Sequence, residues 1–187
     1  MISSVLASST AAIDAEFNTA LRLAASIHDI GMARVPVEVV LKPSSLDKTQ
    51  RELIRPHPEE GLEILEDLAK QAVFPEFLYN VSSEVILYHH ENYDGSGYPY
   101  GLKGEEIPLS ARIISICDAY SAMCCKRPHR EAFSHVRALE EIEREAGRFD
   151  PRVLEAFFDI EGQIELAVHR ISEETRNHRS SQSGLNK

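Results

Sequence analysis

The sequence predicts an all-α fold, a bundle of about seven helices around one core. Apolar residues recur every three or four positions in segments spread along the chain, which is the spacing of an amphipathic helix. The β-branched apolar stretch at 35–41 contains Pro36 and is too short to found a sheet, so we predict an extended connection there. With 187 residues and 43% hydrophobic content, the chain can bury one substantial core.

The first predicted helix covers 14–30. Gly31 is well suited to end this helix, which would place the adjacent His28 and Asp29 in its last turn. A short helix is expected at 48–54, after a connection that contains proline and serine. The apolar positions that mark the first helix follow helical spacing and are Phe17, Leu21, Ala24, Ala25 and Ile27.

Three further histidines are expected at the ends of the next two helices. His57 precedes a proline, a residue that favours the first helical position, so His57 is expected at the start of the helix at 58–69. The following helix, at 77–90, ends with His89 and His90. Glycines and prolines come soon after them and forbid extension of the helix, which leaves a loop that can curl back over the histidines.

A longer apolar helix is expected to begin at Pro108 and to end at Arg127. Asp118 lies within it, and a buried carboxylate in an apolar helix needs a cation or several hydrogen bonds. Two more helices are predicted, one capped by Ser134 and one that Asp150 caps with a proline behind it. The predicted helical neighbours of the carboxylate are Ile114, Cys117, Ala119 and Ala122.

We expect one domain at 14–171, preceded by an N-terminal segment at 1–13 and followed by a polar, flexible tail at 172–187. The chain has no run of about 18 apolar residues and no basic N-terminal leader, so neither a membrane span nor a signal peptide is predicted. The three cysteines sit close together on one predicted helix and offer no disulfide framework. These features predict a cytoplasmic protein with no membrane partner.

The formal net charge of −10 disfavours a nucleic acid polymer as a partner. Affinity for such polymers comes largely from lysine and arginine side chains that replace counterions on the phosphates. A small anionic substrate is compatible with this charge if bound metals and a few basic groups supply local positive charge. Arg127 and Arg130 are the candidates for those basic groups.

Side chains of metal-ligand type occur in four separate segments. Imidazole and carboxylate without thiolate favour borderline or harder divalent metals such as iron, manganese or zinc, and a catalytic site. An adjacent His-Asp pair fits two metals with one bridging carboxylate, which is typical of phosphate-ester hydrolysis. Taken singly, a histidine can instead be a helix cap, and paired histidines can contact the last helical carbonyls. The six candidate ligands are His28, Asp29, His57, His89, His90 and Asp118.

The order and spacing of these residues resemble the HD-GYP family of bacterial cyclic di-GMP phosphodiesterases. His28-Asp29 carries the HD signature, and Gly97-Tyr98-Pro99 carries the GYP signature in a stretch that continues to Pro108. The resemblance covers roughly 21–158, which is most of the chain. It implies an HD-superfamily helical bundle with the metal site at one end.

The resemblance also implies two divalent metal ions, with iron or manganese expected. The six candidate ligands would hold them, with His28 and Asp29 at the catalytic centre and the carboxylate of Asp29 as the bridge. Arg127 and Arg130 would bind substrate phosphates through planar, two-point contacts. In this mechanism water attacks phosphorus, and no covalent nucleophile is required.

The implied substrate is cyclic di-GMP, opened to linear pGpG or to GMP in bacterial signal transduction. Tyr98 and Pro99 would form a lip of the nucleotide pocket. The same loop, Gly97-Tyr98-Pro99, has a second family role as a surface that docks diguanylate cyclase domains, and sequence does not separate the two roles. A homodimer is a further partner hypothesis.

Departures from the family pattern support an alternative function, a degenerate HD-GYP module that binds nucleotide or docks signalling proteins with little turnover. No histidine precedes His28, although family members carry another ligand histidine on an upstream helix, which we expect to be missing or truncated. Met32 replaces a lysine that contacts substrate phosphate, and Ser121 replaces a common aspartate. Arg34 would compensate for the lost charge only if its side chain turned inward. The sequence alone does not decide between the phosphodiesterase and the degenerate module.

Overall fold

The computed structural model describes residues 14–125 and 131–168. All regular structure in these ranges is helical and none of it is strand, which confirms the all-α class, and the seven predicted helices are all present. The α-helices are α2 (Ala15–Ile27), α3 (Val37–Val40), α4 (Lys48–Ile54), α5 (His57–Gln71), α6 (Glu76–Tyr88), α7 (Leu109–Cys124), α8 (His135–Arg144) and α9 (Pro151–Asp159). The last described residues, 161–168, are α-helical as well. The 3-10 helices are η1 (Ile30–Arg34), η2 (Gly104–Glu106) and η3 (Ala146–Arg148).

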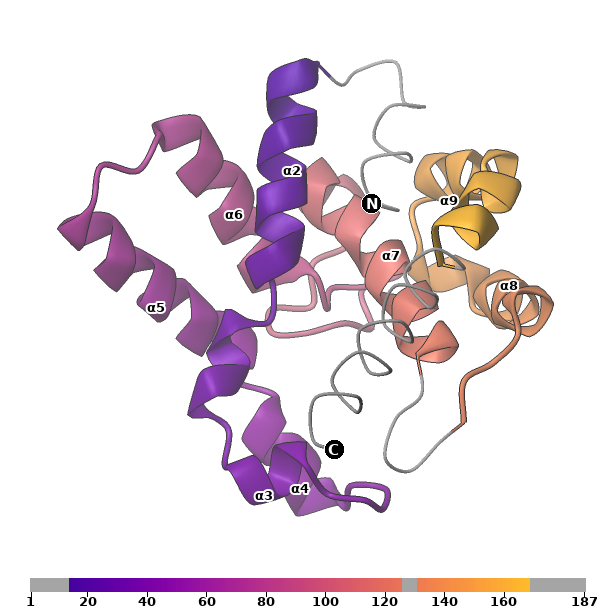
Figure 1. The fold of residues 1–187 in the computed structure, drawn as a ribbon, viewed down its shortest axis with the longest axis horizontal. Helices are drawn as coiled ribbons and strands as arrows, with labels where there is room; N and C mark the ends of the chain where they lie inside the picture. The colour runs from indigo at the N-terminus through magenta and orange to yellow at the C-terminus, as the bar shows by residue number, and fades with distance from the viewer. Residues whose placement is uncertain (1–13, 126–130, 169–187) are drawn as a thin grey trace, which may run out of the picture.

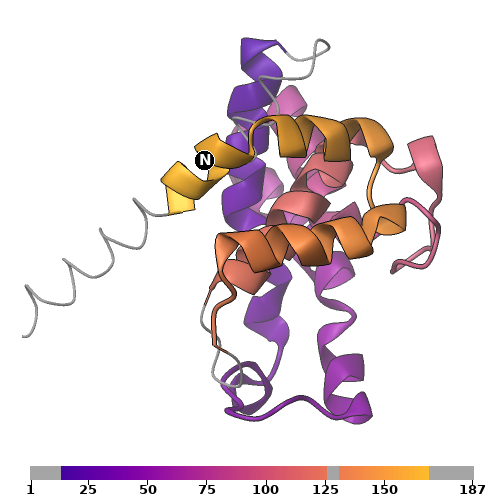
Figure 2. The same ribbon diagram turned by 90° about the vertical axis from the view of Figure 1, so that its right-hand side faces the viewer.

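The helices form two groups that meet at α7. In the first group α2 packs along α6, and α5 packs against α6 and η1, while α3 and α4 project below them (Figure 1). In the second group α8 packs against α7, and Figure 2 shows α8 and α9 crossing the face of the molecule on that side. α7 contacts α6 as well as α8 and α9, so it joins the two groups.

Side-chain caps fix several helix starts. A carboxylate oxygen of Asp14 accepts a hydrogen bond from the backbone N–H of Phe17 at 2.7 Å, at the start of α2. Ser134 and Asp150 cap α8 and α9, which confirms both predicted caps. Each such cap typically contributes about 1 kcal/mol, so these short polar residues help to define where the chain enters a helix.

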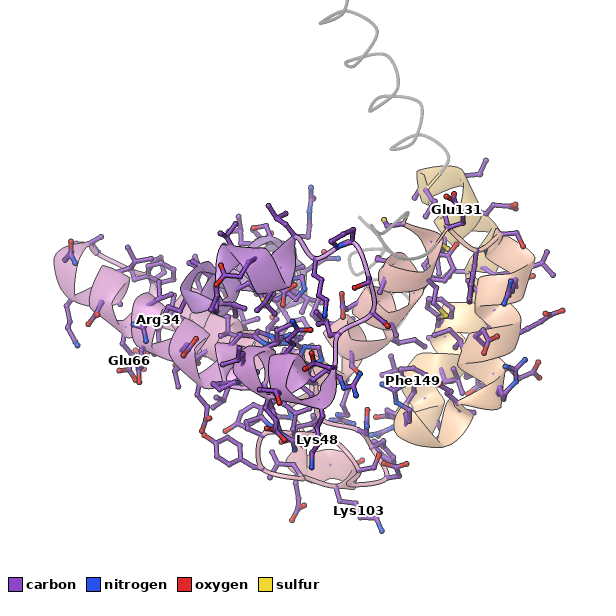
Figure 3. The ribbon with its side chains drawn as sticks, turned by 90° about the horizontal axis from the view of Figure 1, so that it is seen from below. Arg34, Lys48, Glu66, Lys103, Glu131 and Phe149 are labelled. Carbon is purple, nitrogen blue, oxygen red and sulfur yellow. The ribbon has the colours of Figure 1, made fainter. Side chains whose placement is uncertain are left out.

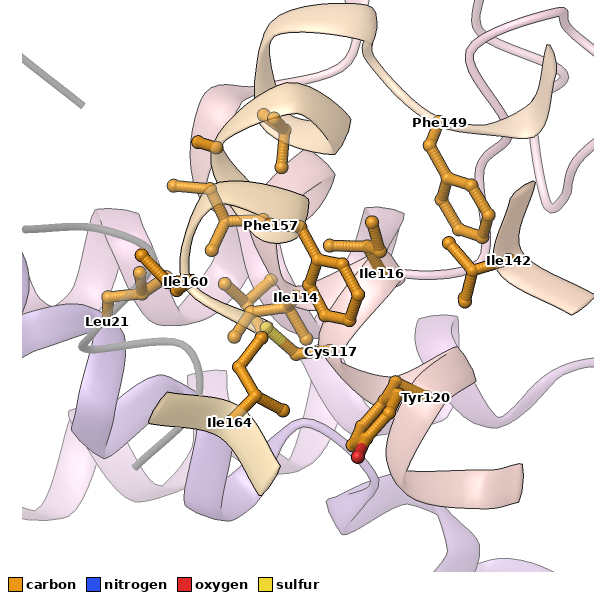
Figure 4. Packing of buried hydrophobic residues seen from close by; sticks show 14 of the residues in the cluster. Leu21, Ile114, Ile116, Cys117, Tyr120, Ile142, Phe149, Phe157, Ile160 and Ile164 are labelled. Carbon is orange, nitrogen blue, oxygen red and sulfur yellow. The ribbon is translucent and has the colours of Figure 1, made fainter. Parts of the chain in front are cut away.

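The main core lies between α2, α6, α7, α8 and α9 (Figure 4). Its two largest fully buried side chains are Tyr120 of α7 and Phe157 of α9, whose ring centroids lie 5.6 Å apart in an edge-to-face arrangement. Leu21, Ile116 and Ile142 bring α2, α7 and α8 into the same cluster and are also fully buried. Burying side chains of this size contributes about 1.5–3 kcal/mol each, so the core holds the two groups of helices together.

The structure corrects two sequence predictions. α2 ends at Ile27 because the chain tightens there into η1, where the N–H of Met32 bonds to the carbonyl of Asp29 at 2.9 Å. His28 and Asp29 therefore lie just beyond the helix and not in its last turn. In the stretch at 35–41, expected to be extended, four residues form the single turn α3, because a proline in front of them favours a helical start.

Within the described ranges, no helix is both long and apolar enough to cross a membrane. The predicted N-terminal segment at 1–13 and the predicted tail at 172–187 lie outside the described residues. The division into one domain with two flanking segments therefore stays a prediction.

Candidate metal centre

The six predicted ligand side chains lie close together. The chain segments that carry them come together near the lower end of α2 in Figure 1. His57 begins α5, as predicted. The other segments present their ligands beyond a helix end or from within a helix, so ligands far apart in the sequence converge. His28 and Asp29 follow α2, His89 and His90 follow α6, and Asp118 lies within α7.

Asp29 is at the middle of the cluster. Its Oδ1 lies 3.3 Å from Nε2 of His57 and 3.5 Å from Nε2 of His89, and these two nitrogens are 3.4 Å apart. Together with His90, these residues offer four ligand atoms that all lie within 4.8 Å of one another. His57 and His89 are buried, whereas the side chain of Asp29 between them is 52% exposed.

A second group lies on the other side of the Asp29 carboxylate. Its Oδ2 is 3.4 Å from Nε2 of His28, and the same nitrogen is 3.7 Å from Oδ1 of Asp118. The Nε2 atom of His28 is buried and has no hydrogen-bond partner. A buried nitrogen that faces two carboxylates without a bond to either is a position that suits a cation.

Backbone carbonyls decide which nitrogen of each ring faces the cluster. Nδ1 lies 2.9 Å from the carbonyl oxygen of Ala25 in His28 and 2.9 Å from that of Ile54 in His57. In His89, Nδ1 lies 2.9 Å from the carbonyl oxygen of Val85. A neutral ring that donates its Nδ1–H to a carbonyl turns the lone pair of Nε2 inward, which is how histidine ligands are commonly oriented.

Burial and neighbouring charge shift the pKa values in the cluster in opposite directions. Burial lowers the pKa of His28, but the nearby carboxylates of Asp118 and Asp29 outweigh this and raise the pKa to about 9. Burial and two neighbouring imidazoles lower the pKa of His90 to about 3. Partial burial would raise the pKa of Asp29, but the neighbouring imidazoles of His57, His89 and His28 hold it well below its usual range. The cluster thus contains ionised carboxylates that attract cations.

Gly31 allows η1 to lie directly on the start of α5. A Cβ atom at this position would lie 1.9 Å from the carbonyl oxygen of His57 and 2.7 Å from the backbone nitrogen of Gly61. No side chain larger than hydrogen fits there without moving one of the two backbones. This contact sets the position of Asp29, two residues earlier, relative to His57. The role of Gly31 is therefore close approach and not helix termination.

Glu91 ties the loop after the paired histidines to the cluster, and sequence reasoning missed it. This buried carboxylate accepts hydrogen bonds from the backbone N–H groups of Tyr100, Gly101 and Leu102 at 2.7, 3.1 and 3.0 Å. Gly97 packs so closely that a Cβ atom there would lie 2.6 Å from the carbonyl oxygen of His90. The acidic residue next to the His-His pair was a signal that could have revealed this anchor.

Tyr98 lies on the cluster and is linked to a basic residue. Its ring stacks on that of His90 with a centroid distance of 4.7 Å and an interplanar angle of 20°. The guanidinium carbon of Arg55 lies 4.9 Å from the centroid of the Tyr98 ring. The predicted lip residues Tyr98 and Pro99 are both half-buried, and Tyr98 lies beside the candidate ligand His90, as a pocket wall would.

Of the basic groups considered in the sequence, the structure describes Arg34 but not Arg127 or Arg130. Arg34 is exposed and forms an ion pair with Glu63 of α5, so its side chain does not turn inward to replace the charge lost at Met32. In Figure 3, Arg34 lies on the α5 side of the molecule. Arg127 and Arg130 lie outside the described residues, so their predicted contacts with phosphate stay predictions.

Comparison with known proteins gives concordant matches. The sequence model of the HD domain family matches residues 4–153. The chain is similar to a probable cyclic di-GMP phosphodiesterase of Vibrio cholerae, with 41% identity over 155 residues, 81% of this chain and 35% of that protein. It is also similar to a cyclic di-GMP phosphodiesterase of Thermotoga maritima, with 35% identity over 168 residues, 89% of this chain and 44% of that protein. The matched part is less than half of each relative.

A solved structure has a similar fold. Bd1817, a HDG"Y"P protein from Bdellovibrio bacteriovorus, matches with a TM-score of 0.64 over 85% of this chain and 48% of that chain. The two sequences are 22% identical over this match. The likeness therefore concerns the helical fold, and it agrees with the arrangement of α2 to α9 described above.

Proposed function

We propose that this chain, which belongs to the HD domain family, is a metal-dependent phosphodiesterase that hydrolyses cyclic di-GMP. The family match over 4–153 and the two relatives confirm the HD-GYP resemblance recognised in the sequence. The observation that carries the proposal is the position of Asp29, whose two oxygens face two separate groups of ligand atoms. Cyclic di-GMP is the proposed substrate because the two relatives are a probable cyclic di-GMP phosphodiesterase and a cyclic di-GMP phosphodiesterase.

The residues present fit two divalent metal ions, and we propose iron or manganese because the donor set is imidazole and carboxylate. One position would be held by His28, Asp29 and Asp118, and the buried, unbonded Nε2 of His28 supports it. The other would be held by Asp29 together with the three imidazoles of His57, His89 and His90. Bound metal ions would offset the negative charge of the phosphate and lower the pKa of an attacking water.

The chain's own residues would orient the reaction. The carbonyl-anchored rings of His28, His57 and His89 keep their inward nitrogens fixed, so little reorganisation is needed when a phosphodiester arrives. Water adds its oxygen to phosphorus, the bond from phosphorus to a ribose 3′ oxygen breaks, and that oxygen takes up a proton. The product is linear pGpG, and a second cycle gives GMP. The ring of Tyr98 forms a wall beside His90.

Protein partners remain hypotheses. The Tyr98 ring faces His90 and is half-buried, so docking of a diguanylate cyclase domain on this loop would use the neighbouring Tyr100, which is 55% exposed. Its hydroxyl lies 3.3 Å from a carboxylate oxygen of Glu59. A homodimer is likewise a hypothesis that measurement of the mass in solution would test.

The test of the proposed function is metal content and turnover in Asp29→Ala, compared with His57→Ala. Asp29 would contribute to both metal positions, so its loss should affect both, whereas loss of His57 should affect one. We expect Asp29→Ala to bind almost no metal and His57→Ala to keep about one ion per chain, with cyclic di-GMP hydrolysis lost in both. Elemental analysis of anaerobically purified protein and separation of the nucleotide products measure these effects.

Asp67→Ala is the matched control, because Asp67 is an exposed carboxylate on α5 that pairs with Lys70 outside the cluster. It should keep the metal content and turnover of the unmodified chain. Unchanged metal content in Asp29→Ala would rule out the bridge. An unmodified chain that binds metal and nucleotide without turnover would instead support the degenerate signalling module.

A further inference from the structure

Arg55 is the basic residue that the structure places beside the candidate metal centre. It follows directly after α4, and its backbone N–H bonds to the carbonyl of Arg51 at 3.1 Å, which fixes its backbone. It stands two residues before His57. Its guanidinium carbon lies 4.9 Å from the centroid of the Tyr98 ring, and that ring stacks on His90 at 4.7 Å. The Tyr98 ring thus lies between the guanidinium of Arg55 and the candidate ligand His90.

The guanidinium of Arg55 keeps its hydrogen-bond donors available. In the part of the chain that the structure describes, its side chain forms no hydrogen bond and no ion pair, and the residue is exposed. Several of the other described arginines are bound to carboxylates. Arg34 pairs with Glu63, and Arg112 with Asp150. An aromatic face holds the guanidinium plane by cation–π attraction and leaves its N–H edge open to an anion.

The partner ring is suited to this arrangement. The Tyr98 ring is half-buried and lies against the imidazole of His90 at an interplanar angle of 20°. Its backbone is fixed as well, because its N–H bonds to the carbonyl of His90 at 3.2 Å. Tyr98 therefore presents a rigid surface between the ligand histidine and Arg55.

A cyclic dinucleotide carries two phosphates, and hydrolysis at the metal centre uses one of them. We infer that Arg55 binds the second, uncleaved phosphate of the substrate and that its stacking on Tyr98 holds the guanidinium in position. This inference rests on the proposed function. A planar guanidinium matches the paired oxygens of a phosphate in a two-point contact, which a lysine ammonium cannot do. Against an acidic chain with a net charge of −10, such a local cation also draws the anion inward.

Two ligands separate phosphate recognition from guanine recognition. Cyclic di-GMP has two guanines and two phosphates, whereas the linear dinucleotide GpG has two guanines and one phosphate. Affinity for both would be measured on metal-loaded protein, at a temperature where turnover is negligible, and kcat/KM for cyclic di-GMP would be measured in parallel. Arg55→Ala should weaken cyclic di-GMP binding about ten- to a hundredfold and leave GpG binding within about twofold.

Arg55→Lys should recover only part of the affinity, because it restores charge without the planar contact. The matched control is Arg51→Ala, one turn earlier on α4, whose guanidinium bonds to the carbonyl of Leu46. It removes the same charge one helical turn earlier and should leave both affinities unchanged. Equal thermal midpoints of the variants would show that α4 is intact.

The other possible results separate the role of Arg55 from the proposed activity. If Arg55→Ala binds cyclic di-GMP as the unmodified chain does, or loses affinity for GpG equally, the phosphate inference is wrong. If the unmodified chain binds cyclic di-GMP without turnover and Arg55→Ala weakens that binding, Arg55 keeps its role and the proposed activity fails. If the unmodified chain neither binds nor hydrolyses cyclic di-GMP, both are wrong.

Discussion

The two groups of helices hold their buried side chains by different means. Around α7, α8 and α9, apolar side chains interlock, with Phe157 against Tyr120 at 5.6 Å between ring centroids. Around the ends of α2, α5 and α6, buried polar side chains bond to the backbone, and Gly31 lets two backbones touch. Apolar packing loses stability in proportion to the volume removed, whereas the polar region depends on a few fixed distances. Substitutions should therefore separate stability from metal binding.

The largest loss of stability is expected from Phe157→Ala. Removal of this fully buried ring should lower the free energy of unfolding by about 3–5 kcal/mol, because a cavity remains in the core. Metal content per folded chain should not change, because Phe157 lies outside the candidate centre. Urea unfolding and elemental analysis measure the two quantities. Phe158→Ala, at a half-buried neighbouring ring, should cost less, and an equal cost would argue against the core assignment.

Gly31→Ala should mainly lower metal binding and have a smaller effect on stability. A Cβ atom 1.9 Å from the carbonyl oxygen of His57 forces the backbones apart, at a cost of about 1–3 kcal/mol. Because Asp29 and His57 then separate, metal content per chain should fall well below that of the unmodified chain. The loss in free energy of unfolding should be smaller than in Phe157→Ala. Gly162→Ala is the control, since no atom lies within 4 Å of the added methyl group. Full metal content in Gly31→Ala would show that the contact does not position the ligands.

A smaller effect is expected from Glu91→Gln, which tests whether the loop belongs to the polar region. Its carboxylate accepts three backbone hydrogen bonds, and loss of the charge and of one acceptor should cost about 1.5–2 kcal/mol. Hydrogen exchange should become faster at Tyr100, Gly101 and Leu102. Glu106→Gln, in the same loop but exposed, is the control and should change little. Equal exchange in both variants would contradict the anchoring role.

Much of the fold was readable because helical spacing and caps are local. The seven helices and the caps at Ser134 and Asp150 follow from residues close together in the sequence. The convergence of the six ligand side chains was predictable only through the resemblance to a family, because spacing alone does not say which helix ends meet.

The parts that sequence did not reveal depend on contacts between distant segments. The role of Gly31 comes from His57 and Gly61, which approach it only in the folded chain. Glu91 bonds to a loop nine to eleven residues later, and Arg55 faces Tyr98 from another helix end. Such contacts carry no periodic pattern, so only the structure exposes them.

The contacts between imidazole Nδ1 atoms and backbone carbonyls that orient the candidate ligand histidines also cap the C-terminal ends of three helices. The carbonyls of Ala25, Ile54 and Ile86 belong to the last turns of α2, α4 and α6, where backbone acceptors lack intrahelical partners. Each ring thus acts as a C-terminal cap as well as a candidate ligand, and the negative end of the helix dipole favours positive charge near the inward nitrogen. These bonds hold the rings in place without a metal, so a metal ion that binds here would meet a preorganised set of nitrogens.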